Sequence, residues 1–249
     1  MKLMTATLIL AVFGSWSGIV SAASSTSTDR APADNVRVVL IGASIGQEWN
    51  LPGLAKRLHL SGYKFEALQE WQYDKSDRLE ETLMRPERKF HLTASYFKGF
   101  FKESPKPADI VVLKECSSYF PGDTSFDKKK EMMVNWVREV KAKKIRAIVA
   151  TVVPVTRKRA AQNPGKLEGL LAYNDWLRGF ARKENLPLLD LEAAVRTDDR
   201  ERYLRDDLTS GDGSHLNRKA YDILDRVMAE TVCHVHPGDV CAKVSETAK

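Results

Sequence analysis

Three side chains in this sequence have the types and spacing that nucleophilic catalysis needs, and the first of them is Ser44. It lies between Gly42 and Gly46, directly after the apolar run at residues 38–41. Such a run is typical of a buried parallel strand, and the glycines let the backbone turn sharply where a helix begins. Because ligands of open α/β sheets bind at the carboxyl ends of strands, this turn predicts an exposed, nucleophilic Ser44. The alternative is a tight turn with an idle serine.

The other two side chains are Asp212 and His215, in a glycine-rich segment (residues 211–217) ahead of the last predicted helix. Three residues apart at a helix start, both can face the same way. A histidine that takes a proton from a serine needs a carboxylate to fix its tautomer and to stabilise the imidazolium. The pair therefore predicts a base with its orienting acid, whereas a lone histidine is more often structural.

The elements that must position these residues follow a βα pattern. From residue 36 onward, short apolar runs alternate with longer amphipathic stretches, as in parallel α/β folds. We expect strands at residues 38–41, 63–68, 110–113, 145–153 and 186–191, and helices at about 51–60, from about 126, around 170–180 and after 217. This order predicts one domain, residues 35–233, built as a right-handed three-layer α/β/α sandwich around a five-stranded parallel sheet.

Three of these helices carry apolar stripes that should face the core. The stripes consist of Met133, Trp136, Val137 and Val140; of Leu170, Tyr173, Leu177 and Phe180; and of Ala220, Ile223, Leu224, Val227 and Met228. Between the second and third strands, residues 70–90 are highly charged and weakly periodic. We expect an exposed excursion there, followed by a helix at about 92–101.

The N-terminus has the features of a secretory signal peptide. Lys2 precedes an apolar stretch, and small residues precede a predicted cut after Ala22. Serines and glycines interrupt this stretch short of the roughly 20 apolar residues of a membrane span. We expect residues 1–22 to be removed and residues 23–34 to be a disordered leader, which predicts a secreted or periplasmic protein with no membrane span after cleavage.

The net charge of +6 is mildly basic. Lys and Arg are spread over several helices, with denser groups at residues 128–130 and 157–159. Such groups are usually solvated faces, and a secreted protein rarely needs nucleic acid, so no nucleic-acid partner is expected. A polyanionic envelope or extracellular polymer is the alternative partner.

Two of the three cysteines, Cys233 and Cys241, flank a turn-like stretch at the start of the C-terminal tail, residues 234–249. An oxidising compartment favours a disulfide between them, which leaves Cys116 free. Two histidines lie between the thiols and make a zinc site the alternative. Their spacing matches no standard zinc signature, so no metal is expected.

With these motifs the chain resembles the SGNH/GDSL hydrolase family. Gly42-Ala43-Ser44-Ile45 stands where that family has Gly-Asp-Ser-Ile, and Asp212-Gly213-Ser214-His215 matches its Asp-x-x-His. Residues 151–154, and residues 173–177 followed by 186–191, are similar to its fourth-strand exit, penultimate helix and fifth strand. The resemblance implies a flavodoxin-like fold and hydrolysis of esters, thioesters or O-acyl groups without a metal or cofactor. Ser44 would be the nucleophile, His215 the base and Asp212 its orienting acid.

The oxyanion donors of the family are not matched. The segment after the second strand has no glycine, and the third strand runs into Lys114-Glu115-Cys116-Ser117 where the family has Gly-x-Asn-Asp. The family's Asp before the serine is Ala43. We therefore expect the Ser44 amide and Ser117 to serve as oxyanion donors, with Ser118, Lys75 and Ser76 as further candidates.

Together these patterns predict an exported GDSL-type esterase that acts on O-acyl groups of carbohydrate or lipid-like small molecules. An acyltransferase to an envelope polysaccharide is one alternative, because transfer differs only in which hydroxyl attacks the acyl-enzyme. A degenerate glycan-binding member is another, given the missing donors. Gly42-x-Ser44-x-Gly46 also fits the α/β-hydrolase elbow, but in that fold the serine follows several strands, and the acid and histidine lie on separate loops.

Overall fold

The computed structural model describes residues 35–70, 74–76, 78–79, 107–120, 126–163, 165–198, 200–238 and 240–241. The predicted signal peptide, the leader and the helix expected at about 92–101 lie outside these residues and stay predictions. Among the helices that are described, none is long and apolar enough to cross a membrane.

The centre of the fold is a parallel sheet to which the described residues contribute five strands, in the order β2-β1-β3-β4-β5. The strands are β1 Val36–Gly42, β2 Tyr63–Gln69, β3 Ile110–Lys114, β4 Arg146–Ala150 and β5 Leu188–Leu189. Strands β1 and β3 lie inside the sheet with both faces covered, which is why they read as continuous apolar runs. The predicted five-stranded parallel sheet is confirmed.

Strands β4 and β5 are shorter than predicted. After β4 the chain leaves the ladder, because the backbone N–H and C=O of Val152 both bond the Asn174 side chain at 2.8 Å. After β5, Asp190 accepts from the Ala193 amide at 3.2 Å and so caps a helix. These extensions are buried or half-buried, so their apolar pattern does not distinguish a strand from irregular chain packed on the core.

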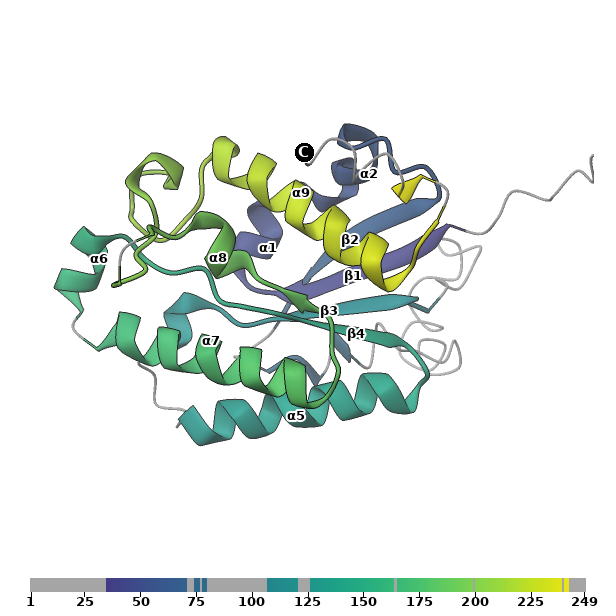
Figure 1. Cartoon of the computed structure of the whole chain (residues 1–249), viewed down its shortest axis with the longest axis horizontal. Coiled ribbons are helices and arrows are strands. Elements are labelled where there is room, and N and C mark those ends of the chain that lie inside the picture. Colours follow the sequence, from purple (N-terminus) through teal and green to yellow (C-terminus); the bar gives the residue numbers. More distant parts are fainter. Residues whose placement is uncertain are drawn as a thin grey trace, which may run out of the picture. The chain divides into compact units, whose positions relative to one another are not determined.

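Helices cover both faces of the sheet (Figure 1). One face carries α5 (Phe126–Ala142) and α7 (Lys166–Lys183). The other carries α1 (Ser44–Glu48), α2 (Leu54–Arg57), α8 (Leu191–Val195) and α9 (Arg218–Val235). Each face has its own buried apolar cluster, so the predicted three-layer α/β/α sandwich is confirmed.

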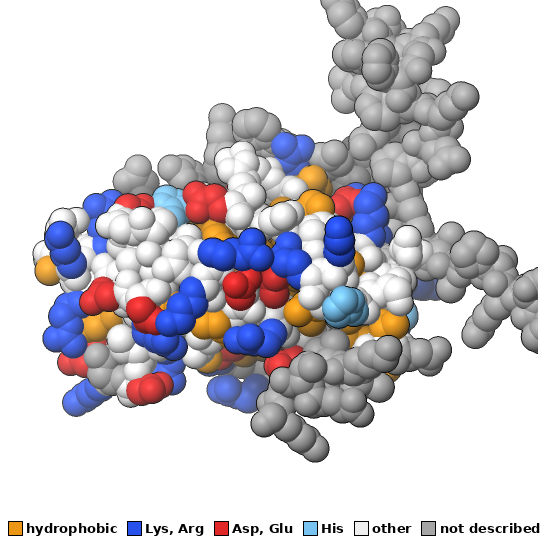
Figure 2. All heavy atoms as spheres, turned by 90° about the horizontal axis from the view of Figure 1, so that it is seen from above, with side chains coloured by type: hydrophobic (Ala, Val, Ile, Leu, Met, Phe, Trp, Pro, Cys, Tyr) orange, Lys and Arg blue, Asp and Glu red, His pale blue; other side chains and the backbone are white. Residues whose placement is uncertain are grey.

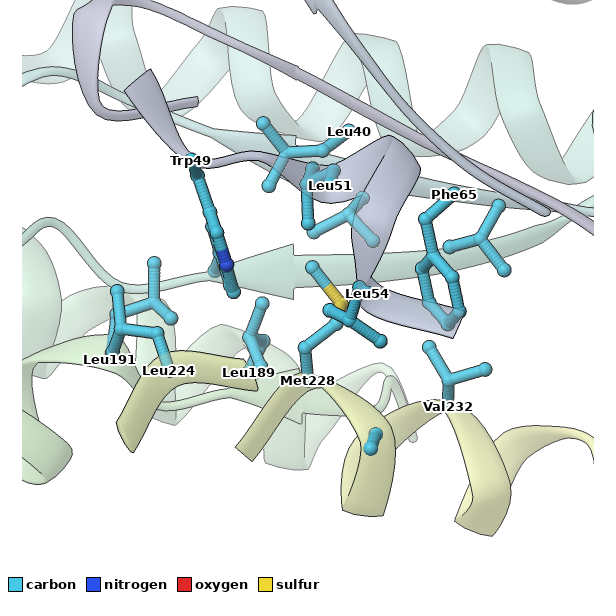
Figure 3. Packing of buried hydrophobic residues seen from close by; sticks show 14 of the residues in the cluster. Leu40, Trp49, Leu51, Leu54, Phe65, Leu189, Leu191, Leu224, Met228 and Val232 are labelled. Atoms are coloured by element: carbon cyan, nitrogen blue, oxygen red, sulfur yellow. The ribbon is translucent and has the colours of Figure 1, made fainter. Parts of the chain in front are cut away.

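Helix α9 begins where the sequence predicts, because the Asn217 side chain accepts from the Ala220 amide at 3.1 Å. Three of its side chains point toward the sheet and the α1–α2 segment in Figure 3: Leu224, Met228 and Val232. Two other members of its predicted stripe, Ile223 and Val227, are half-buried.

A buried ion pair ties α9 to the chain that follows Ser44. Asp225 is 3% exposed and accepts from Trp49 Nε1 at 2.8 Å and from Arg57 Nε and Nη2 at 2.6 and 2.8 Å. The hydrogen bonds to Asp225 raise the pKa of Arg57. Because Trp49 directly follows α1, its hydrogen bond to the charged Asp225 holds the end of the short helix that begins at Ser44.

Two local predictions differ from the structure. The helix expected at about 51–60 is a 3-10 turn, Leu51–Gly53, followed by the single turn of α2. The predicted loop before Gly165 contains helix α6, Arg157–Gln162. Thr156 explains it, since its hydroxyl accepts from the Arg159 amide at 3.3 Å and caps the helix.

Cys233 and Cys241 form the predicted disulfide, with Cα atoms 5.4 Å apart, and Cys116 is free and buried. The zinc alternative is wrong, because both thiols are joined, and within the described ranges no cluster of three His, Cys, Asp or Glu suits a metal. Helix α9 runs through the predicted boundary at 233. The described part of the tail, residues 234–238 and 240–241, packs back on the core, where the Tyr63 hydroxyl donates to the His236 carbonyl at 2.5 Å.

The charged surface is mixed. On the face seen in Figure 2, Lys and Arg side chains are interspersed with Asp and Glu. The basic group at 128–130 is not a wholly solvated face, because Lys129 is 3% exposed and its ammonium lies 4.6 Å from the centroid of the Tyr119 ring. Burial lowers the pKa of Lys129. The aromatic ring partly replaces the lost water.

Candidate active site

Ser44 is the first residue of α1 and follows β1 by two positions. The turn closes with a hydrogen bond from the Gly46 amide to the Ala43 carbonyl at 2.8 Å. A Cβ on Gly46 would lie 2.7 Å from Leu40 Cδ2, so a side chain there would make the buried Leu40 shift. The second glycine of the motif therefore favours close packing of α1 on its own strand, with Ser44 at the carboxyl end of β1.

Asp212 and His215 lie in a tight loop, whereas the sequence predicted that they lie at a helix start. Thr209 and Leu216 pair across this loop in an isolated antiparallel bridge. Asp212 Oδ1 accepts from the backbone amides of Ser214 and His215, each at 2.8 Å. These local bonds fold the carboxylate back over the histidine, so the loop itself sets the pair.

Gly213 determines where this loop packs. Its φ of +78° is in the left-handed region, and a Cβ there would lie 2.5 Å from Thr156 Oγ1 and 3.0 Å from Arg159 Cβ. Its carbonyl accepts from the Thr156 amide at 3.0 Å. Both strain and space exclude a side chain, and the loop lies directly against the start of α6.

The structure brings the three predicted side chains together across 171 residues of chain. His215 Nδ1 lies 2.5 Å from Asp212 Oδ2, and its Nε2 lies 3.1 Å from Ser44 Oγ. Burial opposes the charge of Asp212, but hydrogen bonds from the amides and the imidazole outweigh it and lower the pKa of Asp212 to about 2. Asp212 is therefore a carboxylate at neutral pH, able to stabilise an imidazolium.

Glu48 is a neighbour of this group that no sequence motif singles out. Its Oε1 lies 3.9 Å from His215 Nε2, and its Oε2 accepts from the Tyr221 hydroxyl at 3.3 Å. Burial and the charge of Glu48 raise the pKa of Tyr221. The signal was available, because Glu48 is four residues after Ser44 in a helix and so lies on the same face.

A pocket of about 150 Å³ opens beside Ser44. Its walls include the predicted donors Ser117 and Ser118, and two cations that were not predicted, Arg159 and Lys166. The other donor candidates do not line it: Lys75 is fully buried, and the hydroxyl of Ser76 donates to Asp74 at 2.7 Å. A larger depression of about 400 Å³ lies at the amino ends of β4 and β5, at the opposite edge of the sheet from Ser44.

The charged segment after β2 is only partly exposed where it is described. Asp74 and Ser76 are exposed, as predicted, but three other positions are buried and the predicted exposed excursion is wrong for them. Glu70, Lys75 and Leu79 are at most 5% exposed. The ammonium of Lys75 donates to Glu70 Oε2 and, at 3.1 Å, to Glu115 Oε1. The Tyr119 hydroxyl donates to Glu70 Oε1. Charges that the sequence shows only as polar become a mutually neutralising core.

This network lies under the wall of the pocket. The Glu70 amide donates to the Gly42 carbonyl at 3.2 Å, next to the turn that carries Ser44, and Glu115 is two residues before Ser117. Lys114 is fully buried and donates to the Glu115 carbonyl at 2.8 Å. Burial raises the pKa of Glu70 and lowers that of Lys114, while Glu115 and Glu70 outweigh burial at Lys75 and raise its pKa. The exits of β1, β2 and β3 are thus joined by buried charges.

The segments similar to the family's penultimate helix and fifth strand are joined by buried and half-buried polar side chains. Arg178 donates to both oxygens of Asp190, at 2.9 and 2.7 Å, and pairs with the buried Glu192 at 2.9 Å. The Thr151 hydroxyl donates to Asp190 at 3.0 Å. These bonds hold the exits of β4 and β5 to α7.

Several solved structures have a fold similar to that of this chain. No protein-family model matches the chain, and no curated protein is significantly similar to it in sequence. Among solved structures, it is similar to a GDSL-like lipase from Bacteroides thetaiotaomicron (TM-score 0.57, 14% identity, covering 80% of this chain and 89% of that one). It is also similar to an acetyl xylan esterase (0.54, 17%, 78% and 98%) and to a lipase/acylhydrolase from Enterococcus faecalis (0.51, 18%, 77% and 92%). The chain therefore has the three-layer α/β/α fold of the SGNH/GDSL hydrolases.

Proposed function

We propose that the protein is a serine hydrolase that cleaves carboxylic esters with Ser44, His215 and Asp212. The observation that carries this proposal is the chain of two hydrogen bonds from Asp212 through His215 to Ser44 Oγ, at the carboxyl end of β1 and beside a pocket. The structural neighbours named as lipase, acylhydrolase and esterase support it, because they share the fold on which this arrangement sits.

In the reaction we propose, His215 Nε2 accepts the Ser44 proton as Oγ bonds to the ester carbonyl carbon. The carbonyl oxygen takes the negative charge. When the intermediate collapses, the bond to the alcohol breaks and the imidazolium gives its proton to the leaving oxygen. Water then attacks the acyl-enzyme by the same route, which releases the carboxylic acid and restores Ser44. Asp212 holds the ring tautomer and offsets the imidazolium charge.

The developing oxyanion needs donors, and two features support the predicted ones. The first N–H groups of a helix have no partner within the helix, and Ser44 is the first residue of α1. Ser117 lines the same pocket from the exit of β3. The small pocket volume favours a short acyl group such as acetyl.

The test is covalent labelling together with ester hydrolysis. Wild-type protein should react with a fluorophosphonate probe and hydrolyse p-nitrophenyl acetate, and Ser44→Ala should do neither. Ser61→Ala, an exposed serine in the turn before β2, is the matched control and should keep both activities. Retained hydrolysis in Ser44→Ala would show that the nucleophile is wrong. Adding a polysaccharide acceptor to the wild-type assay distinguishes acyl transfer from hydrolysis.

We also propose that residues 1–22 are removed on export and that residues 35–233 form the hydrolase domain. The disulfide Cys233–Cys241 supports this, because such bonds persist in oxidising compartments. The mass of the protein recovered from outside the cytoplasm should correspond to a chain beginning at Ala23. A full-length mass would contradict cleavage.

A further inference from the structure

Two cations line the pocket beside Ser44, and neither has a carboxylate partner among the described residues. Lys166 is only 9% exposed, and Arg159 makes its side-chain bond to the neutral Gln162 at 3.0 Å. The other buried lysines have partners, and Lys114 donates to the Glu115 carbonyl at 2.8 Å. Lys75 has two carboxylates within reach, and the ammonium of Lys129 lies over two aromatic rings.

The fold holds both cations at the pocket. Lys166 is the first residue of α7, placed by Gly165 at φ +85° and by a bond from its amide to the Asn163 carbonyl at 3.2 Å. Arg159 lies on α6. Its Cβ lies so close to Gly213 that a side chain at position 213 would not fit. The same packing that positions the Asp212–His215 loop therefore positions Arg159.

Among the described residues that line the pocket, Asp212 is the one carboxylate, and its oxygens already have partners. Asp212 Oδ1 accepts two backbone amides and its Oδ2 faces His215 Nδ1. Burial and the neighbouring charge of Arg159 lower the pKa of Lys166, as expected where positive charge is not compensated. Burying an ammonium without a counter-charge is costly, and an anionic ligand would remove that cost.

We propose that Lys166 and Arg159 bind a carboxylate of the substrate, so that the pocket selects esters with a negative charge within a few atoms of the scissile carbonyl. This inference rests on the proposed ester hydrolysis at Ser44. The anionic group can belong to the acyl part or to the alcohol part of the ester, and both give the same recognition chemistry. A guanidinium fork and an ammonium at one site suit a carboxylate, because the first binds it through two parallel bonds.

The experiment compares matched charged and neutral esters. On the acyl side the pair is the p-nitrophenyl half-ester of glutaric acid against p-nitrophenyl valerate, and on the alcohol side it is 4-acetoxybenzoate against its methyl ester. In wild-type protein kcat/KM should favour the anionic member of at least one pair by about tenfold or more. Lys166→Met, which keeps the length of the side chain, and the exposed Arg159→Gln should each bring that ratio toward one.

Lys158→Gln is the control, because Lys158 is an exposed cation on α6 that does not line the pocket, and it should keep the wild-type ratio. A ratio that falls as strongly in Lys158→Gln would overturn the proposal, since it would report only net charge. Raising the ionic strength should reduce the preference only in part, because salt screens the exposed Arg159 more than Lys166, which is 9% exposed.

A binding measurement separates this inference from the catalytic one. Ser44→Ala, which cannot turn over, should bind glutarate by calorimetry, and Ser44→Ala with Lys166→Met should bind it at least about tenfold more weakly. If wild-type protein hydrolyses neutral esters through Ser44 without preferring either anionic ester, the carboxylate site is wrong and the hydrolase proposal stands. If glutarate binds through Lys166 but no ester is cleaved, the hydrolase proposal fails and the anion site stands.

Discussion

The two sides of the pocket are built in opposite ways. The side of the proposed triad, with Asp212 and His215 on the loop at 209–217, is shaped mainly by hydrogen bonds between residues at most six apart in the chain. One bond from a distant segment, from the Thr156 amide to the Gly213 carbonyl, docks this loop. The side of the proposed oxyanion donors, which we call the oxyanion side, is formed by the exits of β2 and β3. It depends on Glu70, Lys75 and Glu115, with up to 40 residues between partners. One side is half-exposed and the other fully buried. One wall of the pocket is therefore shaped mainly by hydrogen bonds within a short loop, and the other by charged side chains buried in the core.

The largest expected effect is chemical and lies on the triad side. Asp212→Asn keeps an oxygen for the two loop amides but cannot hold His215 in the tautomer that accepts the Ser44 proton. We expect kcat for p-nitrophenyl acetate to fall by about 10⁴-fold, while the melting temperature falls by only about 2–4 °C. Steady-state kinetics and a thermal melt check this. An Asn variant of near-normal rate would mean that Asp212 only shapes the loop.

The next effect lies on the oxyanion side and concerns stability. Lys75→Met leaves the carboxylates of Glu70 and Glu115 buried without their cation. We expect a loss of about 3–5 kcal/mol in the free energy of unfolding, measured with urea. Lys56→Met, an exposed lysine on α2, should stay within about 0.5 kcal/mol of wild type. Equal effects of the two substitutions would remove the contrast between the two sides.

Ser117 joins the two sides, because it follows the buried network and lines the pocket. We expect the Ser117 hydroxyl to donate to the oxyanion. Ser117→Ala should therefore lower kcat by about 10- to 100-fold with KM nearly unchanged, because such a donor acts in the transition state. Ser118→Ala, on the same 3-10 turn, is the comparison. A rise in KM without a loss in kcat would assign Ser117 to substrate binding instead.

The smallest effect is the response of stability to acid. The pKa of Asp212 is lowered from 3.8 to about 2, so the native state binds fewer protons than the unfolded state in that window. Its contribution is present above about pH 4 and is lost as the pH falls toward 2, about 1 kcal/mol after allowing for its half-exposed side chain. Glu70 acts in the opposite direction. Because burial raises its pKa, its contribution falls as the pH rises above 4.5.

Urea unfolding of wild type and Asp212→Asn between pH 2 and 6 measures the acid response. The difference in unfolding free energy between the two proteins should shrink as the pH falls. A constant difference would show that the Asp212 charge does not contribute to folding.

Much of the frame could be read from the sequence. The strands β1 and β3 appear as mostly apolar runs and the edge strand β2 as a partly alternating one. Asn217 predicts the start of α9. The spacing of Asp212 and His215 predicted their contact, although the turn is made by Asp212 accepting amides rather than by a helix. Local hydrogen bonding and side-chain periodicity determine these features, so a short window of sequence contains what is needed.

The tertiary structure decided what lies on the pocket walls. Nothing in the order of residues says that Lys75 pairs with Glu115, that Lys129 meets aromatic rings, or that α6 carries Arg159 to the Asp212 loop. A charged residue reads as solvated until the topology brings an opposite charge to it and the sheet excludes water. Burial and partner choice are properties of the whole packed chain, because the cost of burying a charge depends on what faces it from distant segments.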